Sequence, residues 1–84
     1  MKNILFTLAL LISFNSFGQT HEEYVDSAKS KFIDGDYNGA ILDYTKAIET
    51  GNYSPMDFYN RALAKEELKD YDGAIQDVGS TIIM

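Results

Sequence analysis

Apolar residues recur every three or four positions through most of this chain, which predicts α-helices that each bury one side. We expect the first helix to run from Thr20 to Asp34. Its apolar stripe consists of Tyr24, Ala28 and Phe32. Thr20 and Glu23 have the spacing of a capping box, and Gly35 suits a left-handed helix end. The pattern therefore fixes both the buried side of this helix and its two ends.

The same periodicity predicts three more helices, over residues 37–50, 55–68 and 70 onward. Asp36, Ser54 and Asp70 are placed to cap their starts. The inward-facing stripes consist of Ala40, Ile41, Tyr44, Ala47 and Ile48, then Phe58, Ala62 and Leu63, then Ala74, Ile75, Val78 and Ile82. Turns of a few residues imply antiparallel neighbours, and no segment shows the two-residue alternation of a strand.

An eight-letter segment occurs twice in almost the same form. Positions 36–43 read DYNGAILD and positions 70–77 read DYDGAIQD, so six of the eight letters are identical at a 34-residue offset. A fixed period between about 20 and 50 residues is typical of repeat architectures. Stacked repeats form extended grooves, so the period favours a binding surface over a catalytic site.

The order of aromatic, small and acidic residues within this period resembles the tetratricopeptide repeat family. The residues that match its pattern are Tyr24, Ala28, Tyr37, Ala40, Tyr44, Ala47, Phe58, Ala62, Tyr71 and Ala74. The resemblance implies an all-α fold of tandem antiparallel helix–turn–helix repeats, a short α-solenoid. It divides the chain into a first unit at residues 19–54 and a second, incomplete unit at residues 55–84.

Several positions depart from the family pattern. Polar residues replace the Leu and Tyr that the family prefers at Ser27, Lys31, Arg61 and Lys65. The similarity between the units ends after Asp77, where Gly79 enters a predicted helix interior at a cost of about 1 kcal/mol relative to Ala. From this ending we expect one of two situations: a truncated or frame-altered fragment of a longer repeat protein, or a C-terminal helix that self-associates.

The N-terminal segment has the composition of a signal peptide. Lys2 precedes an apolar run at positions 4–14, and the small residues Ser16 and Gly18 occupy the cleavage positions. The run is too short to span a membrane, although an uncleaved anchor is the alternative. We therefore predict a signal peptide at residues 1–18, a secreted or periplasmic protein, and no stable membrane anchor after cleavage.

Charge and composition narrow the possible functions. Without the predicted signal the chain has 6 basic and 13 acidic residues, a net charge of −7, which disfavours nucleic acid as a partner. The single His21 is expected to be an exposed residue at a helix start, and the carboxylates are expected at caps and helix surfaces. With no Cys and no nucleophile–base pattern, we expect no enzyme activity, no metal and no cofactor.

The resemblance also implies a binding site. In tetratricopeptide proteins the first helix of each unit lines a concave groove. The residues expected to face it here are Glu22, Val25, Asp26, Lys29, Phe32, Met56, Tyr59, Asn60, Leu63 and Glu67. Asn60 matches a position of the subfamily that grips C-terminal carboxylates, but Val25 and Lys29 do not, which argues against that activity. The prediction is an exported scaffold or adaptor that binds a protein or peptide; the alternative is a fragment without independent activity.

Overall fold

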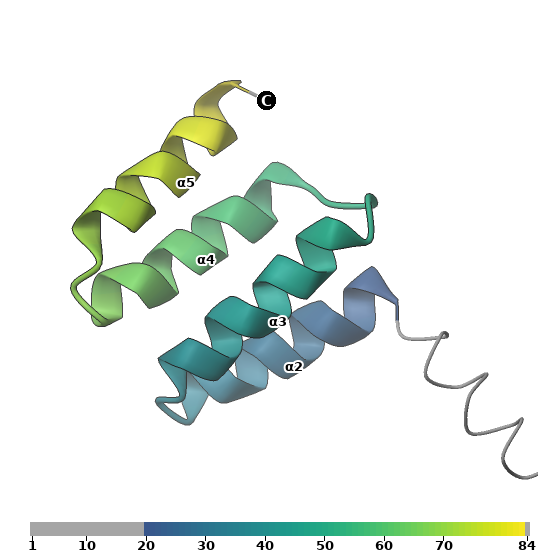
Figure 1. The fold of residues 1–84 in the computed structure, drawn as a ribbon. Helices are drawn as coiled ribbons and strands as arrows, with labels where there is room; N and C mark the ends of the chain where they lie inside the picture. Colours follow the sequence, from purple (N-terminus) through teal and green to yellow (C-terminus); the bar gives the residue numbers. More distant parts are fainter. Residues whose placement is uncertain (1–19, 84) are drawn as a thin grey trace, which may run out of the picture.

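The computed structural model describes residues 20–83, which form four α-helices of 13 residues each. In chain order they are α2 (His21–Ile33), α3 (Tyr37–Glu49), α4 (Pro55–Glu67) and α5 (Tyr71–Ile83). Each helix packs against the next, and the chain reverses direction at every turn (Figure 1). The described part of the chain is therefore all-helical, as the sequence predicts, with helix ends within one residue of the expected positions. The predicted signal peptide lies outside the described residues.

The repeated Asp and Gly residues have a local explanation at the starts of α3 and α5. The carboxylate of Asp36 accepts a hydrogen bond from the Gly39 N–H at 3.0 Å, and Asp70 accepts one from Gly73 at 3.1 Å. A Cβ atom at either glycine would collide with the capping carboxylate. Glycine at this position lets the capping carboxylate lie close to the helix start, whereas a side chain there would require the carboxylate to shift, and both copies share this arrangement.

The ends of the first helices of the two units differ. Gly35 adopts the left-handed conformation, with φ of 85°, as the sequence predicts. Its counterpart one repeat later is Lys69, which adopts the same conformation with φ of 65°. A side chain in this conformation costs roughly 1 kcal/mol, because its Cβ approaches the backbone. The second unit therefore keeps the turn geometry without the residue that suits it.

The core lies between the first unit and α4. Its buried members are Ala28, Ala40, Tyr44 and Ala64, and the half-buried Val25, Phe32, Tyr37 and Ile41 pack against them. The rings of Phe32 and Tyr37 meet edge to face at 5.1 Å, so Tyr37 covers the turn between α2 and α3 as expected. Small residues on α2, α3 and α4 allow these helices to approach one another closely. Because Ala64 is part of this cluster, α4 covers the core of the first unit.

The apolar stripe of α5 is not covered in the same way. The sequence pattern placed Ile75 and Val78 on an inward-facing stripe, but Ile75 is 69% exposed and Val78 is 38% exposed. Tyr71, the counterpart of Tyr37, is also exposed. The prediction of burial was wrong here because no element of residues 20–83 packs on this side of α5. Among these same residues, no helix is long and apolar enough to cross a bilayer.

Candidate functional site: the groove between α2 and α4

The first helices of the two units are joined at their N-terminal ends. The Nε2 atom of His21, in the first turn of α2, lies 2.5 Å from the Oδ2 atom of Asp57 in α4. Asp57 also accepts a hydrogen bond from the Ser54 N–H at 3.0 Å, so one buried carboxylate caps α4 and contacts α2. His21 is therefore a half-buried contact between helices, and the expectation of a freely exposed residue was wrong.

A hollow of about 240 Å³ opens further along these helices. Lys29, Phe32 and Ile33 of α2 form one wall, Asn60 and Leu63 of α4 form the other, and Tyr44 of α3 also lines it. We call these six residues the groove. Because α2 and α4 are the first helices of their units, the groove lies on the side where the family resemblance placed a binding surface.

The groove combines apolar surface with a few polar groups. Phe32, Tyr44 and Leu63 provide the apolar part, Lys29 supplies a cation, and Asn60 supplies an amide that both donates and accepts hydrogen bonds. Burial, with a smaller contribution from the negative charge of Asp57, raises the pKa of Tyr44 above its ordinary value, so the phenol stays neutral at physiological pH. A site of this kind suits a peptide that carries an apolar side chain beside an acidic or carbonyl group.

Only part of the predicted groove set lies together. Lys29, Phe32, Asn60 and Leu63 line the groove, whereas Val25 packs against the core. Tyr59 lines a separate hollow between α4 and α5. The other predicted residues do not line the groove and are exposed on α2 and α4: Glu22, Asp26, Met56 and Glu67.

The prediction missed two groove residues, Ile33 and Tyr44. Ile33 is 82% exposed, the largest exposure among the large apolar side chains of residues 20–81. It lies one repeat before Glu67, which the prediction included. Applying the repeat offset to the predicted set would therefore have found Ile33. Tyr44 was assigned only a structural role, although its ring serves both the core and the groove.

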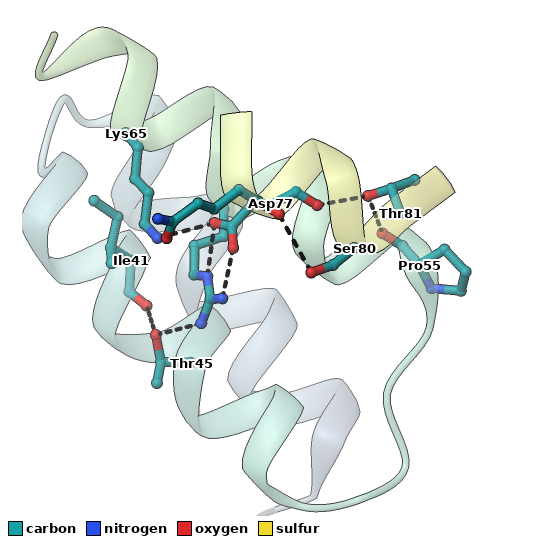
Figure 2. A network of polar contacts seen from close by, with 9 residues as sticks. Ile41, Thr45, Pro55, Lys65, Asp77, Ser80 and Thr81 are labelled. Carbon is teal, nitrogen blue, oxygen red and sulfur yellow. Dashed lines mark hydrogen bonds and ion pairs between the residues drawn. The ribbon is translucent and has the colours of Figure 1, made fainter. Parts of the chain in front are cut away.

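A second polar arrangement lies between the helices of each unit and centres on a buried carboxylate. In the second unit Asp77 accepts hydrogen bonds from Nε and Nη2 of Arg61 at 2.9 and 2.7 Å. The Nζ atom of Lys65 lies 3.0 Å from the same carboxylate, and Figure 2 shows Lys65 and Asp77 directed toward each other. Arg61 also donates to the Thr45 hydroxyl of α3 at 3.1 Å. This cluster therefore links the two units.

The first unit contains the corresponding cluster at Asp43. Ser27 donates a hydrogen bond to this carboxylate at 2.6 Å, and the Nζ atom of Lys31 lies 2.8 Å from it. Burial tends to raise the pKa of Asp43 and of Asp77, but the hydrogen bonds and nearby cations outweigh it, so both pKa values lie below the ordinary value. Both carboxylates are therefore ionised at neutral pH.

These clusters correct the expectation that carboxylates lie only at caps and surfaces, and they explain the polar departures from the family pattern. Asp43 and Asp77 are buried, so the prediction that carboxylates lie at caps and surfaces was wrong for them. The four polar departures from the family pattern all contact these two carboxylates, and each has its counterpart in the other unit: Ser27, Lys31, Arg61 and Lys65. The departures are therefore one repeated structural feature. Within residues 20–83, no three His, Cys, Asp or Glu side chains gather as metal ligands.

Comparison with known proteins gives one informative similarity. The chain is 31% identical over 64 residues, 76% of its length, to a TPR repeat-containing protein of Methanocaldococcus jannaschii. It spans only about 11% of the length of that relative. No family model matches the chain, and no solved structure matches it. The similarity agrees with an all-helical repeat protein of the tetratricopeptide type, a class suggestive of protein–protein interaction.

Proposed function

We propose that this chain is a tetratricopeptide-repeat module that binds a protein or peptide in the groove between α2 and α4. Three observations support the assignment: the 34-residue period, the four antiparallel helices, and the similarity to the archaeal repeat protein. The predicted signal peptide extends the proposal to an exported scaffold or adaptor. The acidic net charge, −6 for the whole chain, favours protein partners over nucleic acid.

The exposure of Ile33 is the observation that carries the proposal. This side chain is 82% exposed at the edge of a hollow whose other apolar residues, Phe32, Tyr44 and Leu63, are half-buried or buried. Covering an exposed Ile side chain stabilises a complex by roughly 1.5–3 kcal/mol before other costs. Lys29 and Asn60, on opposite walls, then fix the orientation of the bound segment by hydrogen bonds. We propose an extended peptide with an apolar anchor and an acidic neighbour as the ligand.

Selection from a random-peptide display library against the purified protein tests this proposal. We expect the enriched peptides to pair an apolar residue with Asp or Glu. Binding should weaken at least about tenfold in Ile33→Asp and in Lys29→Glu, because each removes one of the two recognised features. Neither change disturbs the core, since both side chains are exposed.

Ile75→Lys is the matched control, since Ile75 is exposed on α5 and does not line the groove. It should leave binding of the selected peptides unchanged. Peptides that lose binding in Ile75→Lys but bind normally to Ile33→Asp and Lys29→Glu would contradict the proposed groove.

A further inference from the structure

The predicted cleavage after Gly18 places His21 third in the processed chain. The sequence there reads Gln19-Thr20-His21, so the new N-terminus is the α-amine of Gln19. A free amine, the next two backbone amide nitrogens and the imidazole of a third-position histidine are four nitrogen donors on consecutive residues. They can close around one metal ion in small fused chelate rings. Four nitrogens in one plane are the arrangement that Cu(II) and Ni(II) prefer.

The contacts of His21 determine which of its ring nitrogens is available to a metal. Its Nε2 atom lies 2.5 Å from Oδ2 of Asp57, and the two side chains are 20% and 4% exposed. A neutral imidazole that donates its Nε2–H to this carboxylate has no proton on Nδ1. The free lone pair is then on Nδ1, the ring nitrogen that can close a chelate with the His21 backbone. Metal-binding histidines commonly donate their other ring N–H to a carboxylate in this way.

This contact is not part of the repeat. The counterpart of His21 in the second unit is Pro55, and the counterpart of Asp57 in the first unit is Glu23. Both acids accept a hydrogen bond from the N-cap backbone N–H of their own helix, at 2.8 Å in α2 and 3.0 Å in α4. Helix capping therefore accounts for an acid at this repeat position, but not for the additional contact with an imidazole.

The two amide nitrogens lie at the start of α2. The His21 N–H is at the first position of the helix, where no intrahelical carbonyl accepts it. The Thr20 N–H donates to Oε1 of Glu23, and Thr20 has an extended conformation with ψ of 170°. Chelation must turn the Thr20 peptide so that both nitrogens face the ion. The cost is the loss of an exposed capping box, which four metal–nitrogen bonds can offset.

We propose that the processed chain binds one Cu(II) ion at its N-terminus. The ligands are the Gln19 amine, the amide nitrogens of Thr20 and His21, and Nδ1 of His21, while Asp57 holds the ring through Nε2. Binding releases both amide protons and one proton of the terminal ammonium group. The expectation of no metal considered only side-chain ligands, whereas three of these four donors belong to the backbone. The proposal rests on the predicted cleavage after Gly18 and is independent of the groove.

Export of the full 84-residue chain from a bacterial host tests the proposal. The mass of the recovered protein first shows whether the chain begins at Gln19. Titration with copper(II) sulfate should then give one bound ion per chain, with the electron paramagnetic resonance pattern of four nitrogens in one plane. Zn(II), which prefers tetrahedral sites, should not displace it. A chain that begins at another residue, or one that begins at Gln19 without this signal, would overturn the proposal; the groove is tested separately by peptide binding.

A blocked amine is controlled by a variant at the first position. An N-terminal Gln can cyclise with loss of ammonia, which removes the amine that the chelate needs. Gln19→Ala keeps a free amine and cannot cyclise, so it should bind Cu(II) with the same spectrum. Absence of the four-nitrogen spectrum in correctly processed Gln19→Ala would overturn the proposal without any effect of cyclisation.

Four further variants separate the chelate from adventitious copper. Thr20→Pro keeps the imidazole but has no N–H to lose, so it should abolish the four-nitrogen spectrum, as should His21→Gln. Asp57→Asn can still cap α4 and should weaken Cu(II) binding by about tenfold to a hundredfold. Glu22→Gln, which removes an exposed neighbouring carboxylate, should leave binding unchanged. An unaltered spectrum in Thr20→Pro would overturn the chelate, and unaltered affinity in Asp57→Asn would overturn the role assigned to Asp57.

Discussion

The first and second units share a backbone plan but differ in what covers them. Ala40 and Tyr44 in α3 are buried, whereas the corresponding Ala74 in α5 is half-buried and Val78 is 38% exposed. The difference arises because α4 lies over the first unit and no element of residues 20–83 lies over the second (Figure 1). The repeat therefore sets which residues form each surface, and the neighbouring helix determines whether that surface is buried or exposed.

The buried carboxylates show a second difference. Asp43 contacts side chains of its own unit, and its partner Lys31 has a side chain that is 40% exposed. Asp77 is held by Arg61 and Lys65, whose side chains are 16% and 19% exposed. Since Arg61 also bonds to Thr45 of α3, the Asp77 cluster spans both units. We infer that the same carboxylate position contributes more to stability in the second unit.

The largest predicted effect comes from removing the second-unit carboxylate. Asp77→Asn leaves two poorly exposed cations without their partner, and we expect a loss of roughly 3 kcal/mol in the free energy of unfolding. Asp43→Asn should cost only about 1 kcal/mol, because Lys31 can turn into water and Ser27 can still bond to the amide. Urea denaturation of the two variants checks this order, and a greater loss in Asp43→Asn would contradict it.

The next prediction tests whether α4 covers the first unit more closely than any described element covers the second. Ala40→Leu adds volume to a position that is fully buried between helices, and we expect a loss of roughly 1–3 kcal/mol from overpacking. Ala74→Leu places the same side chain at the counterpart in α5, which lines the hollow between α4 and α5, and there we expect a change within about 0.5 kcal/mol. Thermal melts of both proteins measure the difference. If Ala40→Leu melts like the wild type, this result would contradict the close helix packing assigned to Ala40.

A smaller effect concerns the two left-handed helix ends. Lys69→Gly should stabilise the protein by roughly 0.5–1 kcal/mol, because Gly adopts this conformation without strain. Gly35→Lys should destabilise it by a similar amount, since it makes the first turn resemble the second. The urea midpoints of the two variants should move in opposite directions; shifts of the same sign would refute the assigned strain.

The smallest predicted effect is a change in how the free energy of unfolding depends on pH at acid pH. The pKa of Asp77 is below 3.8 in the folded protein, because the hydrogen bonds and charges of Arg61 and Lys65 outweigh the opposing effect of burial. The unfolded chain therefore takes up this proton at a higher pH than the folded chain. The stabilisation is complete above about pH 5 and is lost as the pH falls through the folded pKa. Unfolding free energies measured at several pH values should decrease less steeply with falling pH in Asp77→Asn than in the wild type. An unchanged slope would contradict the lowered pKa of Asp77.

The sequence predicted the elements well because their signals are local. The cap at Thr20, the repeated Asp-x-x-Gly and the turn at Gly35 each act within four residues, so their pattern is visible along the chain. The buried clusters could not be predicted in this way. Asp43 meets Ser27 from 16 residues away, and a lone Asp in a helix gives no sign of which side chain will face it.

The site was predicted in part for a related reason. The family resemblance included Lys29 and Asn60, which line the hollow between α2 and α4, but it gave no sign that α3 also lines this hollow through Tyr44. Helical periodicity also could not distinguish an apolar stripe that another helix covers from an apolar stripe that is left exposed. Ile41 and Ile75 occupy the same repeat position, yet only Ile75 is largely exposed. The difference depends on the tertiary packing of α4 against the first unit, which local sequence patterns do not encode.

Residue-resolved amide hydrogen exchange gives the most direct test that the units differ by their covering. In the free protein we expect the amides of α3 around Ala40 to Ala47 to exchange more slowly than their counterparts in α5, because α4 covers only the former. Equal protection of α3 and α5 in the free protein would contradict the account.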